Sequence, residues 1–102
     1  MGEARMTTIR RRLLISGIVQ GVAFRYYTRA AARDRGVNGW VRNLPDGRVE
    51  AVFEGEQDNV NSMVTWCRRG PSGSQVDDVR IHEERPTGEF TDFEIRYTGW
   101  GY

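Results

Sequence analysis

Arg25 stands out among the residues that could do chemistry, because it lies four positions after Gly21, the second of two glycines (with Gly17) that bracket a turn. Glycine tolerates backbone conformations with positive φ, so this stretch predicts a tight loop between an apolar run and a helical pattern. A strand, a glycine loop and a helix start together favour an anion site, since N–H groups converge there and the helix N-terminus is electropositive. A cation in the first helical turn opposes the helix dipole by about 0.3–1 kcal/mol when exposed. A phosphate held jointly by the loop amides and the Arg25 guanidinium would explain that placement.

This loop alone leaves two interpretations open. Arg25 could equally be a solvated surface arginine, because strand, glycine loop and helix often follow one another in proteins. The stretch is not a Walker loop, since it has no Gly-Lys-Ser/Thr, and it is not a dinucleotide fingerprint. The second half of any site has to come from elsewhere in the chain.

Other catalytic residue types are scarce. All 15 basic residues are arginine, which excludes a lysine Schiff base and a lysine-dependent phosphate loop. Cys67 and His82 are the sole residues of their types, so they cannot supply a four-ligand zinc site or a disulfide within the chain. A Ser-His-Asp or Cys-His site would have to use His82. We therefore expect no cofactor and no metal.

Length and composition predict one globular domain. The chain has 102 residues, 38% of them apolar and 28% charged, with a net charge of +1. That balance gives no support for nucleic-acid binding, and no apolar run approaches the ~20 residues of a membrane span. The first residues are rich in arginine and lack the apolar segment of a signal peptide, so we expect a cytoplasmic protein. The oligomeric state is open at this point, with a monomer as the default. We assign residues 1–8 to a flexible extension, with Met1 or Met6 as the original start, 9–98 to the domain and 99–102 to a tail.

Hydrophobic patterning supplies the elements that must position Arg25. Alternation and apolar runs predict strands over 9–16, 37–43, 48–54 and 76–84, and a last strand containing Phe93, Ile95 and Tyr97. Helical periodicity predicts helices over 24–35 and 58–69. Pro45 followed by Asp46-Gly47 predicts a hairpin between the second and third strands, and Gly55 is expected to break the third strand.

Both predicted helices carry one apolar face at the spacing i, i+3, i+4, i+7. These faces are formed by Phe24, Tyr27, Thr28 and Ala31 in the first helix, and by Val60, Met63, Val64 and Cys67 in the second. Cys67 is therefore interpreted as a buried small hydrophobe and not as a nucleophile. His82 points away from the apolar set of its strand, which favours a surface histidine.

The order of elements, β-α-β-β-α-β plus an added C-terminal strand, predicts a ferredoxin-like α+β sandwich: an antiparallel sheet with two helices on one face. The first and third strands lie at the centre in this topology. The first and second strands run in the same direction, so the loop after the first strand and the end of the second meet at one edge of the sheet. Asn43 ends the second strand, and the fold therefore brings it toward Arg25.

The two motifs that meet there resemble those of a known family. Gly17-Ile18-Val19-Gln20-Gly21-Val22-Ala23-Phe24-Arg25 is similar to the first signature of the acylphosphatases, and Gly39-Trp40-Val41-Arg42-Asn43, followed by Asp46-Gly47, is similar to the second. The resemblance covers residues 9–97 and departs from the pattern at Arg35, where a leucine-like residue is typical. It implies a ferredoxin-like fold and hydrolysis of acyl phosphates to a carboxylate and phosphate. It also implies that Arg25 binds the phosphoryl group with the loop amides and that Asn43 positions the attacking water. The amides belong to Gln20, Gly21, Val22, Ala23, Phe24 and Arg25.

The implied reaction suits the residues that the chain lacks. An acyl phosphate expels a carboxylate, whose conjugate acid has a pKa of about 4–5, so no general acid is needed at neutral pH. Positioning and charge stabilisation on the phosphoryl oxygens then suffice. The alternative is a non-catalytic ferredoxin-like module that binds phosphate or RNA. Its motivation is the row Arg25, Arg29 and Arg33 together with the aromatic C-terminal tail.

Overall fold

The computed structural model describes residues 7–97 of the chain. Most of the predicted N-terminal extension and the whole predicted tail lie outside the described residues. The order of elements is βαββαβ with one further strand, as the sequence predicts. Their bounds are β1 (Thr8–Ile18), α1 (Phe24–Asp34), β2 (Asn38–Asn43), β3 (Val49–Glu56), α2 (Gln57–Arg69), β4 (Gln75–Glu84) and β5 (Phe93–Ile95).

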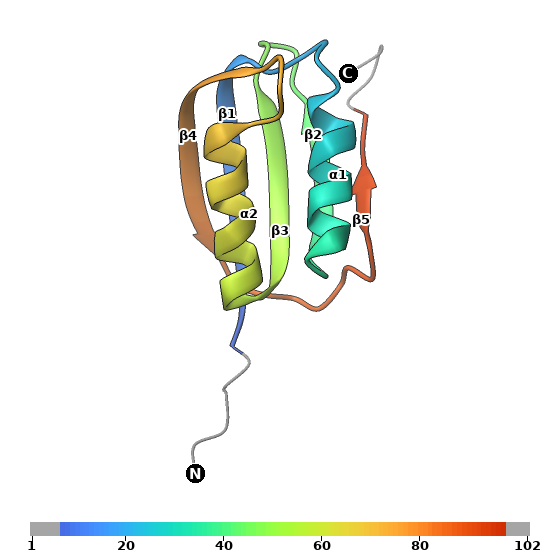
Figure 1. Ribbon diagram of the computed structural model, residues 1–102. Helices are drawn as coiled ribbons and strands as arrows, with labels where there is room; N and C mark the ends of the chain where they lie inside the picture. Colours follow the sequence, from blue (N-terminus) through green and yellow to red (C-terminus); the bar gives the residue numbers. More distant parts are fainter. Residues whose placement is uncertain (1–6, 98–102) are drawn as a thin grey trace.

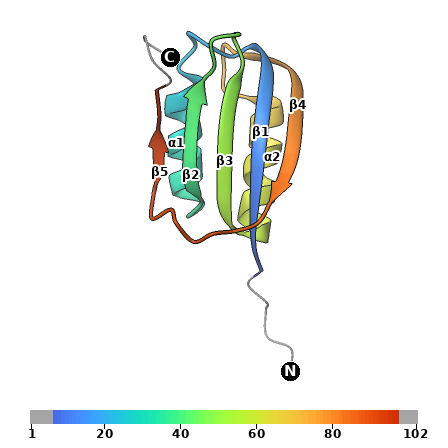
Figure 2. The same cartoon turned by 180° about the vertical axis from the view of Figure 1, so that it is seen from behind.

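The five strands form one sheet in the order β4-β1-β3-β2-β5, with both helices on the same face (Figures 1 and 2). β1 and β3 are central, so the predicted ferredoxin-like α+β sandwich is confirmed. β5 pairs with β2 in parallel, whereas the other neighbouring strands are antiparallel. The sheet is therefore mixed, and the added C-terminal strand lies at the edge beside β2.

Two sequence-based expectations about the elements are wrong. Gly55 does not break the third strand: it lies inside β3 and pairs with Ile9, and the ladder continues to the pair Thr8 and Glu56. A central strand satisfies its backbone groups on both sides, and this pairing outweighs the weak strand preference of glycine. Tyr27 does not belong to the buried face of α1, because 53% of its surface is exposed.

The buried residues of α1 are spaced by four: Phe24, Thr28 and Ala32. The Thr28 hydroxyl donates a hydrogen bond of 2.8 Å to the Phe24 carbonyl oxygen, which satisfies its polar group inside the core. The Phe24 ring meets the Trp66 ring of α2 edge to face, with 5.9 Å between the ring centroids. This contact fixes the first turn of α1 against the second helix.

The core confirms the interpretation of the lone cysteine. Cys67 is fully buried on the inner face of α2, and burial raises the pKa of its thiol. His82 is exposed on β4, as expected. Neither residue lies among those that line the cavity at the start of α1 described below.

Residues 85–92 carry the chain from β4 across the end of the sheet to β5 (Figure 2). The buried carboxylate of Glu54 accepts hydrogen bonds from the backbone N–H groups of Thr87 at 3.0 Å and Gly88 at 2.8 Å. At the end of the segment, the Asp92 carbonyl oxygen accepts a hydrogen bond of 3.0 Å from the Gly39 N–H. The Phe93 N–H and the Arg33 guanidinium hold the pKa of the Asp92 carboxyl below its usual value. These bonds fix the segment so that β5 lies at the edge of the sheet beside β2.

Candidate active site

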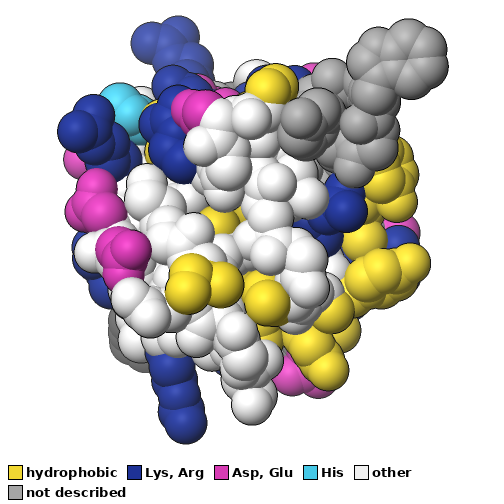
Figure 3. All heavy atoms as spheres, turned by 90° about the horizontal axis from the view of Figure 1, so that it is seen from above, with side chains coloured by type: hydrophobic (Ala, Val, Ile, Leu, Met, Phe, Trp, Pro, Cys, Tyr) yellow, Lys and Arg dark blue, Asp and Glu magenta, His cyan; other side chains and the backbone are white. Residues whose placement is uncertain are grey.

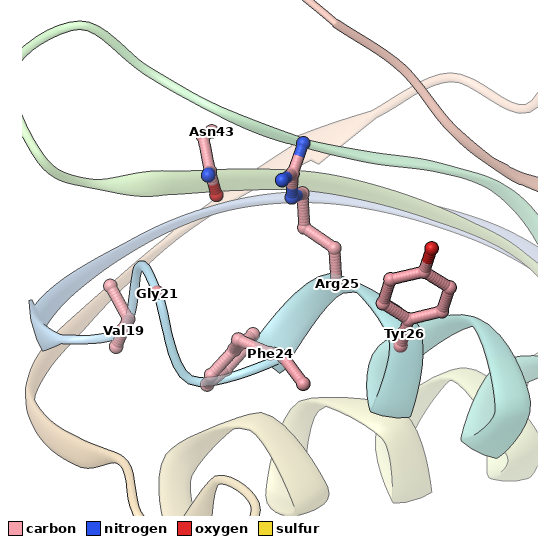
Figure 4. Close-up of a pocket in the computed structure, with 7 residues that line it drawn as sticks. Val19, Gly21, Phe24, Arg25, Tyr26 and Asn43 are labelled. Carbon is pink, nitrogen blue, oxygen red and sulfur yellow. The ribbon is translucent and has the colours of Figure 1, made fainter. Parts of the chain in front are cut away.

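The loop after β1 and the hairpin after β2 lie side by side at the same end of the sheet (Figure 1). A cavity of about 210 Å³ opens there, at the start of α1 (Figure 4). Its walls are formed by Val19, Gly21, Ala23, Phe24, Arg25, Tyr26 and Asn43. The structure thus brings Arg25 and Asn43 together at one cavity, although 17 residues separate them along the chain.

Buried side chains anchor the loop at both ends. Val19 is fully buried and Phe24 is 2% exposed, so the segment between them is fixed to the core on either side. Within it Gly21 has a φ of 75° and Ala23 a φ of 59°, both in the left-handed region. Backbone that alternates between right- and left-handed conformations turns successive N–H groups toward a common point, which is the geometry of an anion-binding nest.

Ala23 is the only non-glycine residue with positive φ in the described part of the chain. A left-handed conformation costs a residue with a Cβ roughly 1–2 kcal/mol. Ala23 is also the N-cap of α1, and its carbonyl oxygen accepts a hydrogen bond of 3.2 Å from the Tyr27 N–H. The strain therefore lies at the junction between the loop and the helix, one residue before Phe24.

The start of α1 suits an anion. Within the described residues, no side chain caps this helix and its first turn contains no acidic residue. Its first N–H groups consequently keep their positive partial charge without compensation from a carboxylate. α2 differs, because Asp58 lies in its first turn.

Gln20 connects the loop to the hairpin. Its side-chain amide donates two hydrogen bonds of 2.8 Å, to the carbonyl oxygens of Leu44 and Arg48. Those two residues flank the turn and follow Asn43, with the Leu44 N–H donating a 2.8 Å hydrogen bond to the Arg48 carbonyl oxygen. The two halves of the site are thus joined directly by one side chain.

Arg25 extends over the cavity from the first turn of α1, next to Asn43 (Figure 4). Its Nη1 atom is inaccessible to solvent, and no described residue provides a hydrogen-bond acceptor for it. A buried guanidinium N–H without an acceptor is costly, so an anion in the cavity would satisfy it. The guanidinium also stacks on the ring of Tyr97, with 5.1 Å between Cζ and the ring centroid.

Asn43 ends β2, pairs with Val49 of β3 and is 7% exposed. Its side chain points toward the cavity from the strand, opposite the loop (Figure 4). An asparagine side chain offers one acceptor and two N–H donors, so it can orient a water molecule as well as hold a substrate oxygen.

The predicted site residues and the cavity overlap without being identical. Gly21, Ala23, Phe24, Arg25 and Asn43 line the cavity, whereas the side chain of Gln20 points to the hairpin and Val22 packs against the core. Sequence reasoning missed Tyr26 and Tyr97. Tyr26 could have been found as the neighbour of Arg25, but no local signal connects Tyr97 to the loop.

No group of three or more His, Cys, Asp or Glu side chains lies where it could hold a metal ion, within residues 7–97. The positive charge of the site comes from arginine and from backbone N–H groups. The surface at this end carries basic side chains beside a group of hydrophobic ones (Figure 3).

Comparison with known proteins identifies the family of this chain. The model of the acylphosphatase family matches residues 11–95, which include both motifs. The chain belongs to the acylphosphatase family. An acylphosphatase from Syntrophobacter fumaroxidans is 60% identical over 87 residues, which cover 85% of this chain and 90% of that protein. One from Chloroflexus aurantiacus is 54% identical over 90 residues, covering 88% and 98%.

A solved structure shares the fold as well as the sequence. The crystal structure of acylphosphatase from Bacillus subtilis superimposes with a TM-score of 0.84 at 37% identity, covering 87% of this chain and 99% of that one. This acylphosphatase therefore acts on acyl phosphates, which it hydrolyses to a carboxylate and phosphate. The expected enzyme class and the ferredoxin-like fold are both confirmed.

Proposed function

We propose that this acylphosphatase works by in-line attack of water on a phosphoryl group held by Arg25 and the loop amides of residues 20–25, with Asn43 positioning the water. The observation that carries this proposal is the buried Nη1 atom of Arg25, which has no acceptor among the described residues and lies at the uncapped start of α1. Two independent sources of positive charge converge there on one cavity. A phosphoryl group satisfies both.

The chemistry requires little else. The oxygen of the attacking water forms a bond to phosphorus while the bond from phosphorus to the acyl oxygen breaks, and the carboxylate leaves with that electron pair. Because the carboxylate is a stable anion, no side chain has to protonate it. The guanidinium and the N–H groups stabilise charge on the phosphoryl oxygens, and Asn43 aligns the water with the scissile bond. We assign the proton of the water to an oxygen of the substrate's own phosphate.

The test is a hydrolysis assay across several acyl phosphates, with a phosphomonoester as the control. We expect turnover of the acyl phosphates and none of the ester, because an alkoxide leaving group needs a proton that this site does not supply. Addition of EDTA should leave the rate unchanged. Comparable turnover of the ester, or loss of activity in EDTA, would contradict the mechanism.

The binding-module alternative receives no support from the arginine row of α1. The Arg29 guanidinium stacks on the Tyr26 ring at 5.2 Å, and Arg33 forms an ion pair with Asp92 at 2.9 Å. The row is therefore divided among separate partners and does not form a continuous basic stripe. Single-stranded RNA that bound in a salt-dependent manner, without phosphate release from acyl phosphates, would restore that alternative.

Among the described helices, none is long and apolar enough to cross a membrane. The cytoplasmic location and the monomeric state stay predictions. The physiological acyl phosphate is not specified by Arg25, Asn43 and the loop, because all of them face the phosphoryl group. Selectivity for the acyl group has to come from the rim of the cavity.

A further inference from the structure

Tyr26 is the aromatic residue at the rim of the cavity. It lies directly after Arg25 in the first turn of α1, lines the same cavity, and leaves 61% of its surface exposed. An exposed ring of this size loses no core packing when it is replaced, so core stability does not explain its position. A ring at the mouth of a substrate cavity offers an apolar surface to whatever part of the substrate extends outward.

A second side chain of α1 restricts the ring. The Arg29 guanidinium, one turn further along α1, stacks on it with 5.2 Å between Cζ and the ring centroid. A cation–π contact at an exposed site restricts the ring without covering both of its faces. Tyr26 therefore presents a pre-oriented surface beside the cavity, which lowers the entropy lost when a ligand contacts it.

In-line attack limits the side of the cavity on which the acyl group can leave. In a displacement at phosphorus, the attacking and leaving oxygens lie on opposite sides of the phosphoryl group. Figure 4 shows Asn43 and Tyr26 on opposite sides of the Arg25 guanidinium. An acyl group that leaves on the side away from Asn43 would then pass the rim of the cavity that Tyr26 lines.

We propose that the ring of Tyr26 is the acyl-binding surface of this enzyme and that it selects acyl phosphates with a flat, apolar acyl group, aromatic ones above all. This inference rests on the proposed function, since it requires a phosphoryl group at Arg25. An aromatic acyl group stacks on the ring, whereas an acetyl group is too small to cover it. Tyr26 acts through this contact alone and takes no part in bond making or breaking.

The experiment compares benzoyl phosphate with acetyl phosphate in the wild-type protein and in Tyr26→Ala, by the ratio of their kcat/KM values. Loss of an aromatic contact is expected to lower the benzoyl-to-acetyl ratio roughly 3- to 10-fold. Tyr26→Phe keeps the stacking surface and should keep the ratio. The matched control is Tyr27→Ala, which removes a ring of similar exposure from the next position of α1, outside the cavity.

Inhibition by inorganic phosphate distinguishes the acyl-binding surface from the phosphoryl-binding site formed by Arg25 and the loop amides. Its inhibition constant should be the same in the wild-type protein and in Tyr26→Ala. An unchanged benzoyl-to-acetyl ratio in Tyr26→Ala, an equal fall of the ratio in Tyr27→Ala, or loss of the ratio in Tyr26→Phe would overturn the proposal. Absence of turnover of both substrates by the wild-type protein is a different result, which contradicts the proposed function itself.

Discussion

The ring of Tyr97 lies against the guanidinium of Arg25, 5.1 Å from Cζ to the ring centroid, and joins the end of the described chain to the cavity. The parallel pairing of β5 with β2 makes this contact possible, because it carries the chain toward the end of the sheet where the cavity opens. The Arg96 N–H donates a hydrogen bond of 2.8 Å to the Val41 carbonyl oxygen, which continues the pairing just before Tyr97. Tyr97 thus restrains the side chain that we assign to the phosphoryl group.

Replacing Tyr97 by leucine should weaken the enzyme without unfolding it. An exposed cation–π contact contributes about 0.5–1 kcal/mol, so kcat/KM for acyl phosphates is expected to fall roughly 2- to 5-fold. The affinity for inorganic phosphate should weaken in parallel, because the guanidinium is less well oriented. Tyr97→Phe retains the ring and should behave as the wild-type protein. Equal kcat/KM values in Tyr97→Leu and the wild-type protein would show that Arg25 needs no such restraint.

Removal of either polar group at the cavity should abolish most of the activity. Loss of one charge-assisted contact in the transition state costs on the order of 3–4 kcal/mol, so Arg25→Ala is expected to lower kcat/KM by two to three orders of magnitude. Asn43→Ala should lower kcat strongly while the inhibition constant of phosphate stays near its wild-type value, since Arg25 and the loop amides are unchanged. Circular dichroism has to show folded protein for both variants. Near-normal turnover in Asn43→Ala would rule out the water-positioning role.

The bridge made by Gln20 predicts a coupled loss of stability and activity. Gln20→Met keeps the length of the side chain but removes both hydrogen bonds to the Leu44 and Arg48 carbonyl oxygens. At about 0.5–1.5 kcal/mol for each bond, the free energy of unfolding should fall by roughly 1–3 kcal/mol. The loop would also lose its register with Asn43, so kcat should decrease even under conditions where all of the protein is folded. Denaturant unfolding and steady-state kinetics measure the two effects separately.

How far the sequence predicts this protein depends on whether a feature is local. The loop, the hairpin and the meeting of Arg25 with Asn43 follow from glycine spacing, turn residues and the topology of the four main strands. The hydrogen bonds of Gln20 and the stacking of Tyr97 join segments that are remote in the chain. Neither residue type indicates which residue it contacts. The helical stripe predicts a buried Tyr27, but the buried residues of α1 follow the spacing Phe24, Thr28, Ala32.

Cys67 offers a check on the packing of α2. Burial raises the pKa of its thiol, so the thiolate that reacts with disulfide reagents is scarce in the folded protein at neutral pH. We expect no reaction with a thiol reagent at pH 8 in buffer, and one thiol per chain in guanidinium chloride. Fast labelling of the native protein would mean that α2 opens readily from the sheet.

Two glycines allow the cost of backbone strain to be separated from its effect on the site. Gly21 in the loop and Gly36 after α1 have similar φ values of 75° and 67°, and a Cβ at either position would meet no atom within 4 Å. Alanine should therefore cost each about 1–2 kcal/mol of unfolding free energy, through the left-handed conformation alone. The activity should differ, because relaxation at residue 21 moves the amides that we assign to the phosphoryl group, whereas residue 36 lies beyond the far end of α1. We expect Gly21→Ala to raise the inhibition constant of phosphate and lower kcat/KM at least several-fold, with Gly36→Ala unchanged in both. An equal effect of the two substitutions on activity would mean that the loop backbone does not bind the phosphoryl group and that Arg25 acts without it.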